Sequence, residues 1–494
     1  MHATATEGDF LGHPKGLYVL FFTEMWERFA YYGMRAILML YMVEHLHFDT
    51  RTAGTVYGAY TGLVYFTPVL GGYLADRYLG QRTSIIIGGL LMALGEFGLG
   101  LGPIAFFYTS LGLIILGNGF FKPNISVIVG QLYGEDDPRR DGGFTIFYMG
   151  INLGAFFSPL VCGTLGQKVG WHWGFFAAGV GMLFGLVVYV WGQRYLGERG
   201  KLDPNRTHLS EEAAAKAMHA DAKAAAKRAA TLLFGLGVAV LLVAIYVGYV
   251  TSPRWGFVAV GMGAVVMMLS YVLTHSQANE RHRVLVVLIL AVFGNVIFWS
   301  AFEQAGSSLT LFAERSTDLS VPLVNGSMPS SWFQSFNPLY IILFAPVFSW
   351  MWVKLAKFGR EPSTPMKFAI GMSMLALGFV VMVAGGAVAD KGVQVSMGWL
   401  SLAYLLHTFG ELCISPVGLS MVTKLAPKRF ASLMMGIWFA SMSVANLVGG
   451  LFAGEYDTMS KALFFAIPVV TAGSAAVLLF LLVRPLRKLM HGVH

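Results

Sequence analysis

Charged residues in the middle of an apolar run are the first feature of this chain that could do chemistry. Residues 17–42 form a run long enough to cross a bilayer as a helix. With about 100° of rotation per residue, the polar side chains of this run fall on one helix face. They are Glu24, Glu27, Arg28, Tyr31, Tyr32 and Arg35. Because charges in hydrocarbon are costly unless they are paired or hydrated, we expect this face to line a cavity, which we interpret as the functional site.

A lysine in a later apolar run is the second candidate. Lys122 lies in the segment 117–124, Gly-Asn-Gly-Phe-Phe-Lys-Pro-Asn, where Pro123 is predicted to interrupt the helix and free backbone carbonyls for ligands. A lysine at this depth needs a carboxylate partner, and the glutamates of the first run are the nearest candidates. A Lys–Glu pair that forms and breaks could couple protonation to gating. Snorkelling is the alternative, but it belongs to helix ends and Lys122 is in the middle of its run.

The second half of the chain carries carboxylates in similar settings. Glu303 follows Trp299 by one helical turn, and Glu411 precedes Ser415 by one turn. Glu303 is a candidate partner for Arg35, so one half offers cations and the other half carboxylates. A zwitterion whose amino and carboxylate groups lie a few ångströms apart would span such a cleft. Both glutamates could instead be structural residues held by hydrogen bonds.

Neutral polar and aromatic side chains supply further candidate contacts. Tyr148 and Asn152 lie one turn apart on one face, and both can hydrogen-bond a peptide backbone. Tyr65 and Asn337 are similar, although polar side chains also bridge helices in bilayers. Three tryptophans could line side-chain pockets or pack in the core or at the interface, namely Trp299, Trp332 and Trp438.

The sequence indicates neither a metal site nor an enzyme. His407 stands one turn before Glu411, but no third ligand of suitable spacing accompanies the pair. The histidines are scattered, and no nucleophile with a neighbouring base stands out. Cys162 and Cys413 lie in apolar runs, one in each half, which suggests neither a disulfide framework nor a thiolate metal site. We therefore expect no cofactor and no bound metal.

The composition is that of a polytopic membrane protein. Of the 494 residues, 56% are hydrophobic and only 12% are charged, far from the balance of a soluble domain. The net charge of +8 could suggest nucleic acid, but in a membrane chain the distribution of lysine and arginine matters more than their sum. Most of them fall in alternate loops that include both termini. This asymmetry predicts that both termini are cytoplasmic and that nucleic acid is not a partner.

Apolar segments predict about fourteen membrane helices in a pattern of six, two and six. The first six lie near residues 17–46, 53–78, 83–102, 106–131, 142–166 and 172–195. A polar linker helix and an inserted two-helix hairpin follow, with spans near 231–251 and 255–275. The last six lie near 284–313, 331–356, 364–387, 396–424, 431–453 and 461–483. We expect an N-terminal bundle (1–196), a linker with hairpin (197–280) and a C-terminal bundle (281–494), the halves of a major facilitator fold.

Two motifs carry a resemblance to a known family. The segment 24–29 matches the pattern Glu-x-x-Glu-Arg-Phe, and 144–154 matches Phe-Tyr-x-x-Ile-Asn-x-Gly. Together with the segments around Lys122 and Glu411, they resemble the proton-coupled oligopeptide transporter family of the major facilitator superfamily. The match covers most of the chain, and the extra hairpin resembles bacterial members.

The resemblance implies import of di- and tripeptides with protons, by rocking of two bundles about a central site. Glu24, Glu27, Arg28, Lys122 and Glu303 would form the proton-coupling group. The substrate-binding residues would be Tyr32, Arg35, Tyr65, Lys122, Tyr148, Asn152, Trp299, Asn337, Glu411, Ser415 and Trp438. Within this set, Arg35 and Lys122 would face the peptide carboxylate. The resemblance further implies a multi-pass protein of a bacterial inner membrane, with the lipid bilayer as its surroundings, and we expect it to function as a monomer.

One position departs from the animal members, and other functions remain open. Animal members have a histidine seven residues before the second-helix tyrosine, where this chain has Gly58. Coupling would then rest on carboxylates, and the sequence does not say which one carries the proton. The alternative within the family is another small anion or zwitterion such as nitrate. A passive channel or a membrane enzyme would be an alternative of a different class.

Overall fold

A computed structural model describes residues 9–134, 137–202, 272, 278–321, 327–427 and 431–491. This part of the chain is almost wholly helical. Two short strands, β1 (Asp9–Phe10) and β2 (His13–Pro14), pair antiparallel ahead of the first helix. The predicted linker helix and hairpin lie outside the described residues, apart from a few positions at their ends.

The first six long helices correspond to the six spans predicted for the first half. They are α1 (Lys15–Leu40), α2 (Thr50–Leu74), α3 (Gln81–Leu99), α4 (Ile104–Gln131), α5 (Arg140–Ser158) and α6 (Trp171–Gly192). Within this group α1 packs against α5 and α6, while α3 packs against α4 and α6. The charged helix α1 is therefore covered by apolar neighbours, as the cost of exposing its charges to lipid requires.

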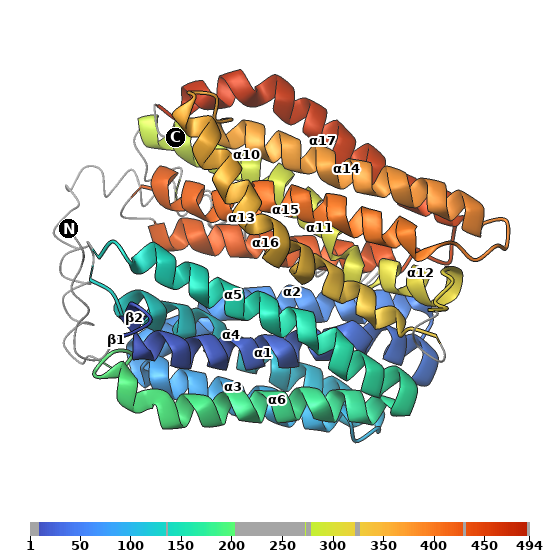
Figure 1. The fold of residues 1–494 in the computed structure, drawn as a ribbon, viewed down its shortest axis with the longest axis horizontal. Helices are drawn as coiled ribbons and strands as arrows, with labels where there is room; N and C mark the ends of the chain where they lie inside the picture. Colours follow the sequence, from blue (N-terminus) through green and yellow to red (C-terminus); the bar gives the residue numbers. More distant parts are fainter. Residues whose placement is uncertain are drawn as a thin grey trace, which may run out of the picture. The chain divides into compact units, whose positions relative to one another are not determined.

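The second group begins with a long helical run. Its α-helical pieces α10 (Ala278–Leu290), α11 (Phe298–Phe302) and α12 (Ser308–Ser316) are joined by a π-helical segment at 291–297 and a 3-10 helical segment at 303–306. Unbroken helices follow: α13 (Phe336–Lys357), α14 (Thr364–Ala389), α15 (Met397–Leu425), α16 (Ala431–Ala453) and α17 (Lys461–Leu489). Helices α14 and α17 lie side by side along most of their length (Figure 1).

Ten segments of the described chain are long and apolar enough to cross a membrane. The predicted all-helical membrane fold is thus confirmed in class. The predicted count of about fourteen helices remains a prediction, because the hairpin lies outside the described residues.

Contacts between Cα atoms divide the chain into two compact units. Unit 1 comprises Met1–Leu46, Phe66–Thr207 and Leu319–Ile342. Unit 2 comprises His47–Tyr65, His208–Asp318 and Leu343–His494. The first part of α2 therefore groups with the helices of the second half, and the start of α13 groups with those of the first half.

Close backbone packing explains why the start of α2 belongs to unit 2. A Cβ at Gly54 would lie 2.6 Å from the carbonyl oxygen of Gly450, and one at Gly58 would lie 2.9 Å from the Cα atom of Gly450. Small residues let two helix backbones approach this closely within a membrane. The contact is extended at the helix end, where Arg51 pairs with Glu455 at 2.8 Å.

Candidate transport site

The polar face of α1 lies inside unit 1. Glu24 and Glu27 are fully buried, and Arg28 is 5% exposed. Helix α5 approaches α1 closely at Gly154, where a Cβ would lie 3.0 Å from the Cβ of Arg28. A larger residue at Gly154 would push α5 away from the charged turn of α1, which gives the last position of the motif 144–154 a physical reason.

Four charged residues form one connected group in unit 1. Arg28 donates two hydrogen bonds to Glu27, one from Nη2 to Oε1 at 2.5 Å and one from Nε to Oε2. Its Nε also lies 3.5 Å from Oε1 of Glu24. Lys122 on α4 donates a hydrogen bond from Nζ to the same Oε1 atom of Glu24. Two carboxylates and two cations therefore balance one another in a buried setting, where an unpaired charge would be costly.

The sequence expectation that Lys122 pairs with a first-run glutamate agrees with this geometry. The partner is Glu24, and the side chain of Lys122 keeps 30% of its surface exposed while that of Glu24 has none. Lys122 is therefore the member of the group that remains most accessible from outside it.

Sequence reasoning missed one member of this group. Asn118 is buried and donates from Nδ2 to Oε1 of Glu27 at 3.3 Å. It lies four residues before Lys122, hence on the same face of α4. This spacing could have indicated Asn118 from the sequence, because a residue one turn from a buried lysine faces the same neighbours.

The expected interruption of the helix at Pro123 is wrong, because α4 continues from Ile104 to Gln131. Proline removes the hydrogen bond to the carbonyl four residues earlier, which here belongs to Gly119. That carbonyl lies directly against Gly71 of α2. Neighbouring backbone therefore covers the freed group, and it is not open to a ligand.

Two tyrosine rings contact the two arginines on the polar face of α1. The guanidinium of Arg28 lies 5.0 Å from the ring centre of Tyr31, and that of Arg35 lies 5.0 Å from the ring centre of Tyr32. Such cation–π contacts are worth about 0.5–2 kcal/mol, with the larger values in desolvated settings. They hold the two arginines in line along α1, with Arg35 only 7% exposed.

The two candidates on α5 differ in exposure although they lie one turn apart. Asn152 is buried and donates from Nδ2 to the carbonyl oxygen of Tyr148 at 3.0 Å. Tyr148 is 43% exposed. Asn337, at the start of α13 in unit 1, is half-buried.

Glu96 on α3 is a buried carboxyl group that no predicted role used. It is fully buried, and neither of its carboxyl oxygens has a hydrogen-bond partner in the described part of the chain. It lies close enough to Glu27 for their charges to interact.

Two candidate residues of unit 2 lie in the helical run from α10 to α12. Glu303 begins the 3-10 segment 303–306 and is 6% exposed. Trp299 on α11 is half-buried and packs on Phe302, with ring centres 5.0 Å apart. The tighter 3-10 segment changes the hydrogen-bonding pattern of the helix at this carboxylate, and Glu303, Gln304 and Gly306 are buried there.

The remaining unit 2 candidates lie on α2, α15 and α16. Glu411 is 8% exposed, and Ser415 one turn later is half-buried. Trp438 is buried and meets Phe368 edge-on, with ring centres 6.5 Å apart. Tyr65 is half-buried at the end of the α2 segment that belongs to this unit.

His407 packs in an aromatic cluster. Its ring centre lies 4.6 Å from that of Phe379. No group of three metal-ligating side chains occurs among the described residues. His407 and Glu411 are thus both buried on α15, and the structure gives His407 a packing role.

Comparisons with known proteins identify the family to which this chain belongs. The family model described as the POT family matches residues 82–469. The peptide transporter YePEPT of Yersinia enterocolitica is 39% identical over 99% of this chain and 98% of its own length. A di-/tripeptide transporter of Lactococcus lactis is 35% identical over 99% of both chains. The crystal structure of peptide transporter POT in complex with sulfate has a TM-score of 0.82 and 38% identity, covering 98% of this chain and 97% of that one. The chain therefore belongs to the POT family of membrane transporters with the major facilitator fold, and it is not an enzyme.

Proposed function

We propose that this protein is a proton-coupled symporter that imports di- and tripeptides by alternating access. The single observation that carries the proposal is the buried group of Glu24, Glu27, Arg28 and Lys122. A balanced set of buried charges with one accessible cation can exchange an internal carboxylate for a substrate carboxylate. Relatives named as peptide and di-/tripeptide transporters, matched along almost the whole chain, support the substrate class.

Protonation of this group would change its preference for an anion. With one proton added to Glu24 or Glu27, the group carries a net charge of +1 instead of zero. Its pairing then weakens, and Lys122 can bind the carboxylate of a peptide. When the proton leaves on the cytoplasmic side, the ion pairs form again and compete the peptide away. Proton and peptide movement are coupled because protonation of a glutamate frees Lys122 to bind the peptide carboxylate. Loss of the proton returns the lysine to the glutamate.

The remaining residues take roles that match their chemistry. Arg35 with Glu303 would form a gate, and Glu411 with Asn337 would hold the peptide amino group. Tyr32, Tyr65 and Asn152 would hydrogen-bond the peptide backbone. The residues that line the rest of the site would be Tyr148, Trp299, Ser415 and Trp438.

We also propose that the protein lies in a bacterial inner membrane with both termini cytoplasmic. The distribution of lysine and arginine among the loops supports this orientation. All groups needed for coupling come from one chain, which supports a functional monomer.

The test is uptake of labelled dialanine into liposomes that contain the purified protein. An imposed inward proton gradient should drive accumulation above the external concentration, and a protonophore should abolish it. Lys122→Gln should lose this accumulation, whereas Lys168→Gln, at an exposed lysine outside the group, should retain it. Uptake that only equilibrates in the wild type would contradict proton coupling, and no uptake would contradict the peptide substrate.

A further inference from the structure

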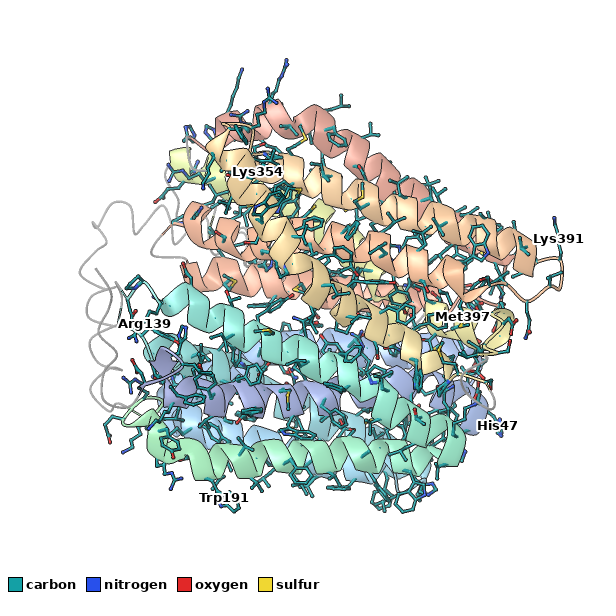
Figure 2. All side chains as sticks on the ribbon, viewed as in Figure 1. His47, Arg139, Trp191, Lys354, Lys391 and Met397 are labelled. Atoms are coloured by element: carbon teal, nitrogen blue, oxygen red, sulfur yellow. The ribbon has the colours of Figure 1, made fainter. Side chains whose placement is uncertain are left out.

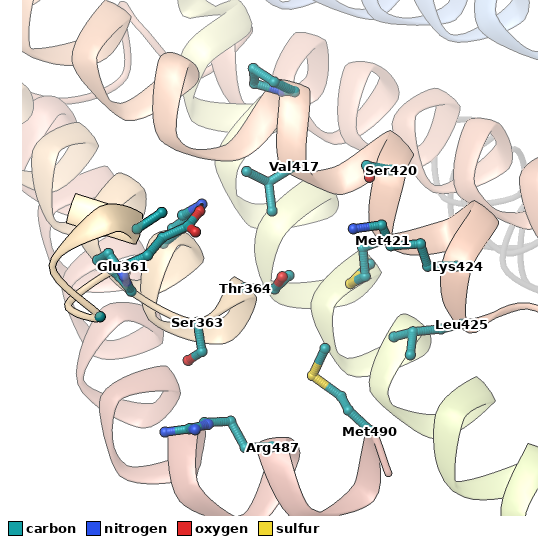
Figure 3. Close-up of a pocket in the computed structure, with 15 residues that line it drawn as sticks. Glu361, Ser363, Thr364, Val417, Ser420, Met421, Lys424, Leu425, Arg487 and Met490 are labelled. Atoms are coloured by element: carbon teal, nitrogen blue, oxygen red, sulfur yellow. Dashed lines mark hydrogen bonds and ion pairs between the residues drawn. The ribbon is translucent and has the colours of Figure 1, made fainter. Parts of the chain in front are cut away.

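A cavity at one end of unit 2 is separate from the residues assigned above. It has a volume of about 650 Å³ and lies between the ends of α13, α14, α15 and α17 (Figure 3). Met490, just after the last helix, contributes to its wall. None of the candidate transport residues lines it.

The side chains around this cavity are predominantly cationic. Lys367, Lys424 and Arg487 come from three different helices, and Glu361 is the one carboxylate among the lining residues. Lys367 is 8% exposed and pairs with Glu361, with Nζ 2.6 Å from Oε1. This pair is neutral as a whole, so the lining keeps a net charge of +2. Such an arrangement attracts an anion.

The rest of the lining mixes polar and apolar side chains. Ser363 and Thr364 offer hydroxyl donors, and Figure 3 shows Met421 and Leu425 beside Lys424. Small-molecule sites typically have volumes of about 300–1,000 Å³. The cavity therefore has room for an anionic group together with an attached apolar or glycerol portion.

The adjacent surface of α13 indicates the depth of this cavity in the membrane. Trp350 is 61% exposed and Phe358 is 68% exposed, and Nζ of Lys354 lies 4.6 Å from the ring centre of Trp350. Exposed aromatic rings with a lysine that extends toward water mark the membrane–water interface. Within unit 2, Lys354 lies toward this end and Lys391 at the opposite one (Figure 2). The cavity thus lies near the level of lipid headgroups.

We propose that this cavity binds a phosphate group, supplied by the headgroup of an anionic phospholipid or by a free phosphate ester. Lys424 and Arg487 contact the phosphate oxygens, and the hydroxyls of Ser363 and Thr364 donate hydrogen bonds to them. The methionines contact the glycerol portion when the source is a lipid. Basic pockets between membrane helices at the cytoplasmic face are known to suit such headgroups.

Native mass spectrometry of the purified full-length protein tests the proposal. Four probes are compared: phosphatidylglycerol, the zwitterionic phosphatidylcholine, and two soluble anions, glycerol 3-phosphate and inorganic phosphate. The double variant Lys424→Gln/Arg487→Gln removes two lining cations. The matched control Arg484→Gln/Lys488→Gln removes the same charge from two exposed positions on α17 that do not line the cavity.

The wild type should bind phosphatidylglycerol more tightly than phosphatidylcholine. Each lining cation is expected to contribute about fivefold, so the double variant should bind about 25-fold more weakly while the control changes less than about twofold. Tight binding of the soluble anions, lost in the same double variant, supports the site with a free phosphate ester as its source. Equal weakening in the two double variants, or no binding of any anionic probe, overturns the proposal. Thermal unfolding of each variant verifies that it is folded.

Discussion

Lys122 and Glu24 are 98 positions apart in the chain, yet Nζ of the lysine donates a hydrogen bond to Oε1 of the glutamate inside unit 1. The same oxygen is within 3.5 Å of Nε of Arg28. Glu24 therefore links the cation of α4 to the ion pair of α1. A change at Lys122 should therefore alter the ion pair of Arg28, and a change in that ion pair should alter the pairing of Lys122.

Removing the lysine should leave a buried carboxylate short of a partner. We expect Lys122→Gln to lower the free energy of unfolding by about 1–3 kcal/mol. The double variant Glu24→Gln/Lys122→Gln should lose less than the sum of the two single variants, because the charge left unpaired by one change is removed by the other. Thermal unfolding of the four proteins in detergent measures this. Strictly additive losses would show that the two groups do not stabilise each other.

Neutralising Glu27 should uncouple transport from the proton gradient. In Glu27→Gln the bidentate pairing with Arg28 is lost, so protonation can no longer switch that pair. We expect pH-driven accumulation of dialanine to be abolished while exchange of internal for external peptide persists. Concentrative uptake by this variant at the wild-type level would contradict the proton-coupling role of Glu27.

The carboxylate of Glu411 should discriminate peptides by their amino end. It is buried, 8% exposed, and a carboxylate in such a site favours a cationic partner. We expect Glu411→Ala to weaken competition by free-amino peptides by at least about tenfold and to change competition by their N-acetylated forms little. Competition against labelled dialanine measures both. Equal loss for the two kinds of peptide would exclude contact with the amino group.

The close packing of α2 on α16 should tolerate no side chain at Gly58. A Cβ there would lie 2.9 Å from both the Cα of Gly450 and the carbonyl oxygen of Leu447. Gly58→Ala should therefore lower the free energy of unfolding by about 1–3 kcal/mol through overpacking. Gly436→Ala is the control, because a Cβ at Gly436 meets nothing within 4 Å. The control should be neutral or slightly stabilising, since alanine favours helix over glycine. Equal changes in the free energy of unfolding for Gly58→Ala and Gly436→Ala would contradict the close contact of α2 with α16 at Gly58.

Arg139 should hold the N-terminal strands against the loop that follows α4. Its Nη1 lies 2.8 Å from Oδ2 of Asp9, and its Nη2 lies 2.8 Å from Oδ2 of Asp137. The hydrogen bonds from Arg139 hold the pKa of Asp137 below its ordinary value. Arg139→Gln should therefore speed amide hydrogen exchange in residues 9–14, whereas the exposed neighbour Arg140→Gln should not.

The lowered pKa of Asp137 also fixes the direction of a pH effect on this contact. A carboxylate whose folded pKa is depressed stabilises the folded state above its unfolded pKa, about 3.9, and loses that contribution as pH falls through the folded value. Protection of the amides in residues 9–14, taken relative to the intrinsic exchange rate at each pH, should therefore be high at neutral pH and fall only below about pH 4. Protection that stays unchanged below about pH 4 would contradict this pH effect.

The class of fold followed from the sequence because its physical cause is local. An apolar run of about twenty residues must satisfy its backbone hydrogen bonds within itself in a bilayer, so it forms a helix. Helical periodicity alone places Glu24, Glu27 and Arg28 on one face. The need of Lys122 for a carboxylate is likewise a property of that one residue in hydrocarbon.

Only the tertiary structure decided which groups meet. Periodicity could not choose between Glu24 and Glu27 as partner of Lys122, because the choice depends on how α4 sits along α1. The same holds for Pro123, whose freed carbonyl is covered by α2, and for the start of α2, which packs on α16 through Gly58. The cavity lined by Lys367, Lys424 and Arg487 combines residues far apart in the chain. Sequence patterns determine each helix and its polar face, whereas the axial position of one helix against another depends on packing among residues that no local pattern relates.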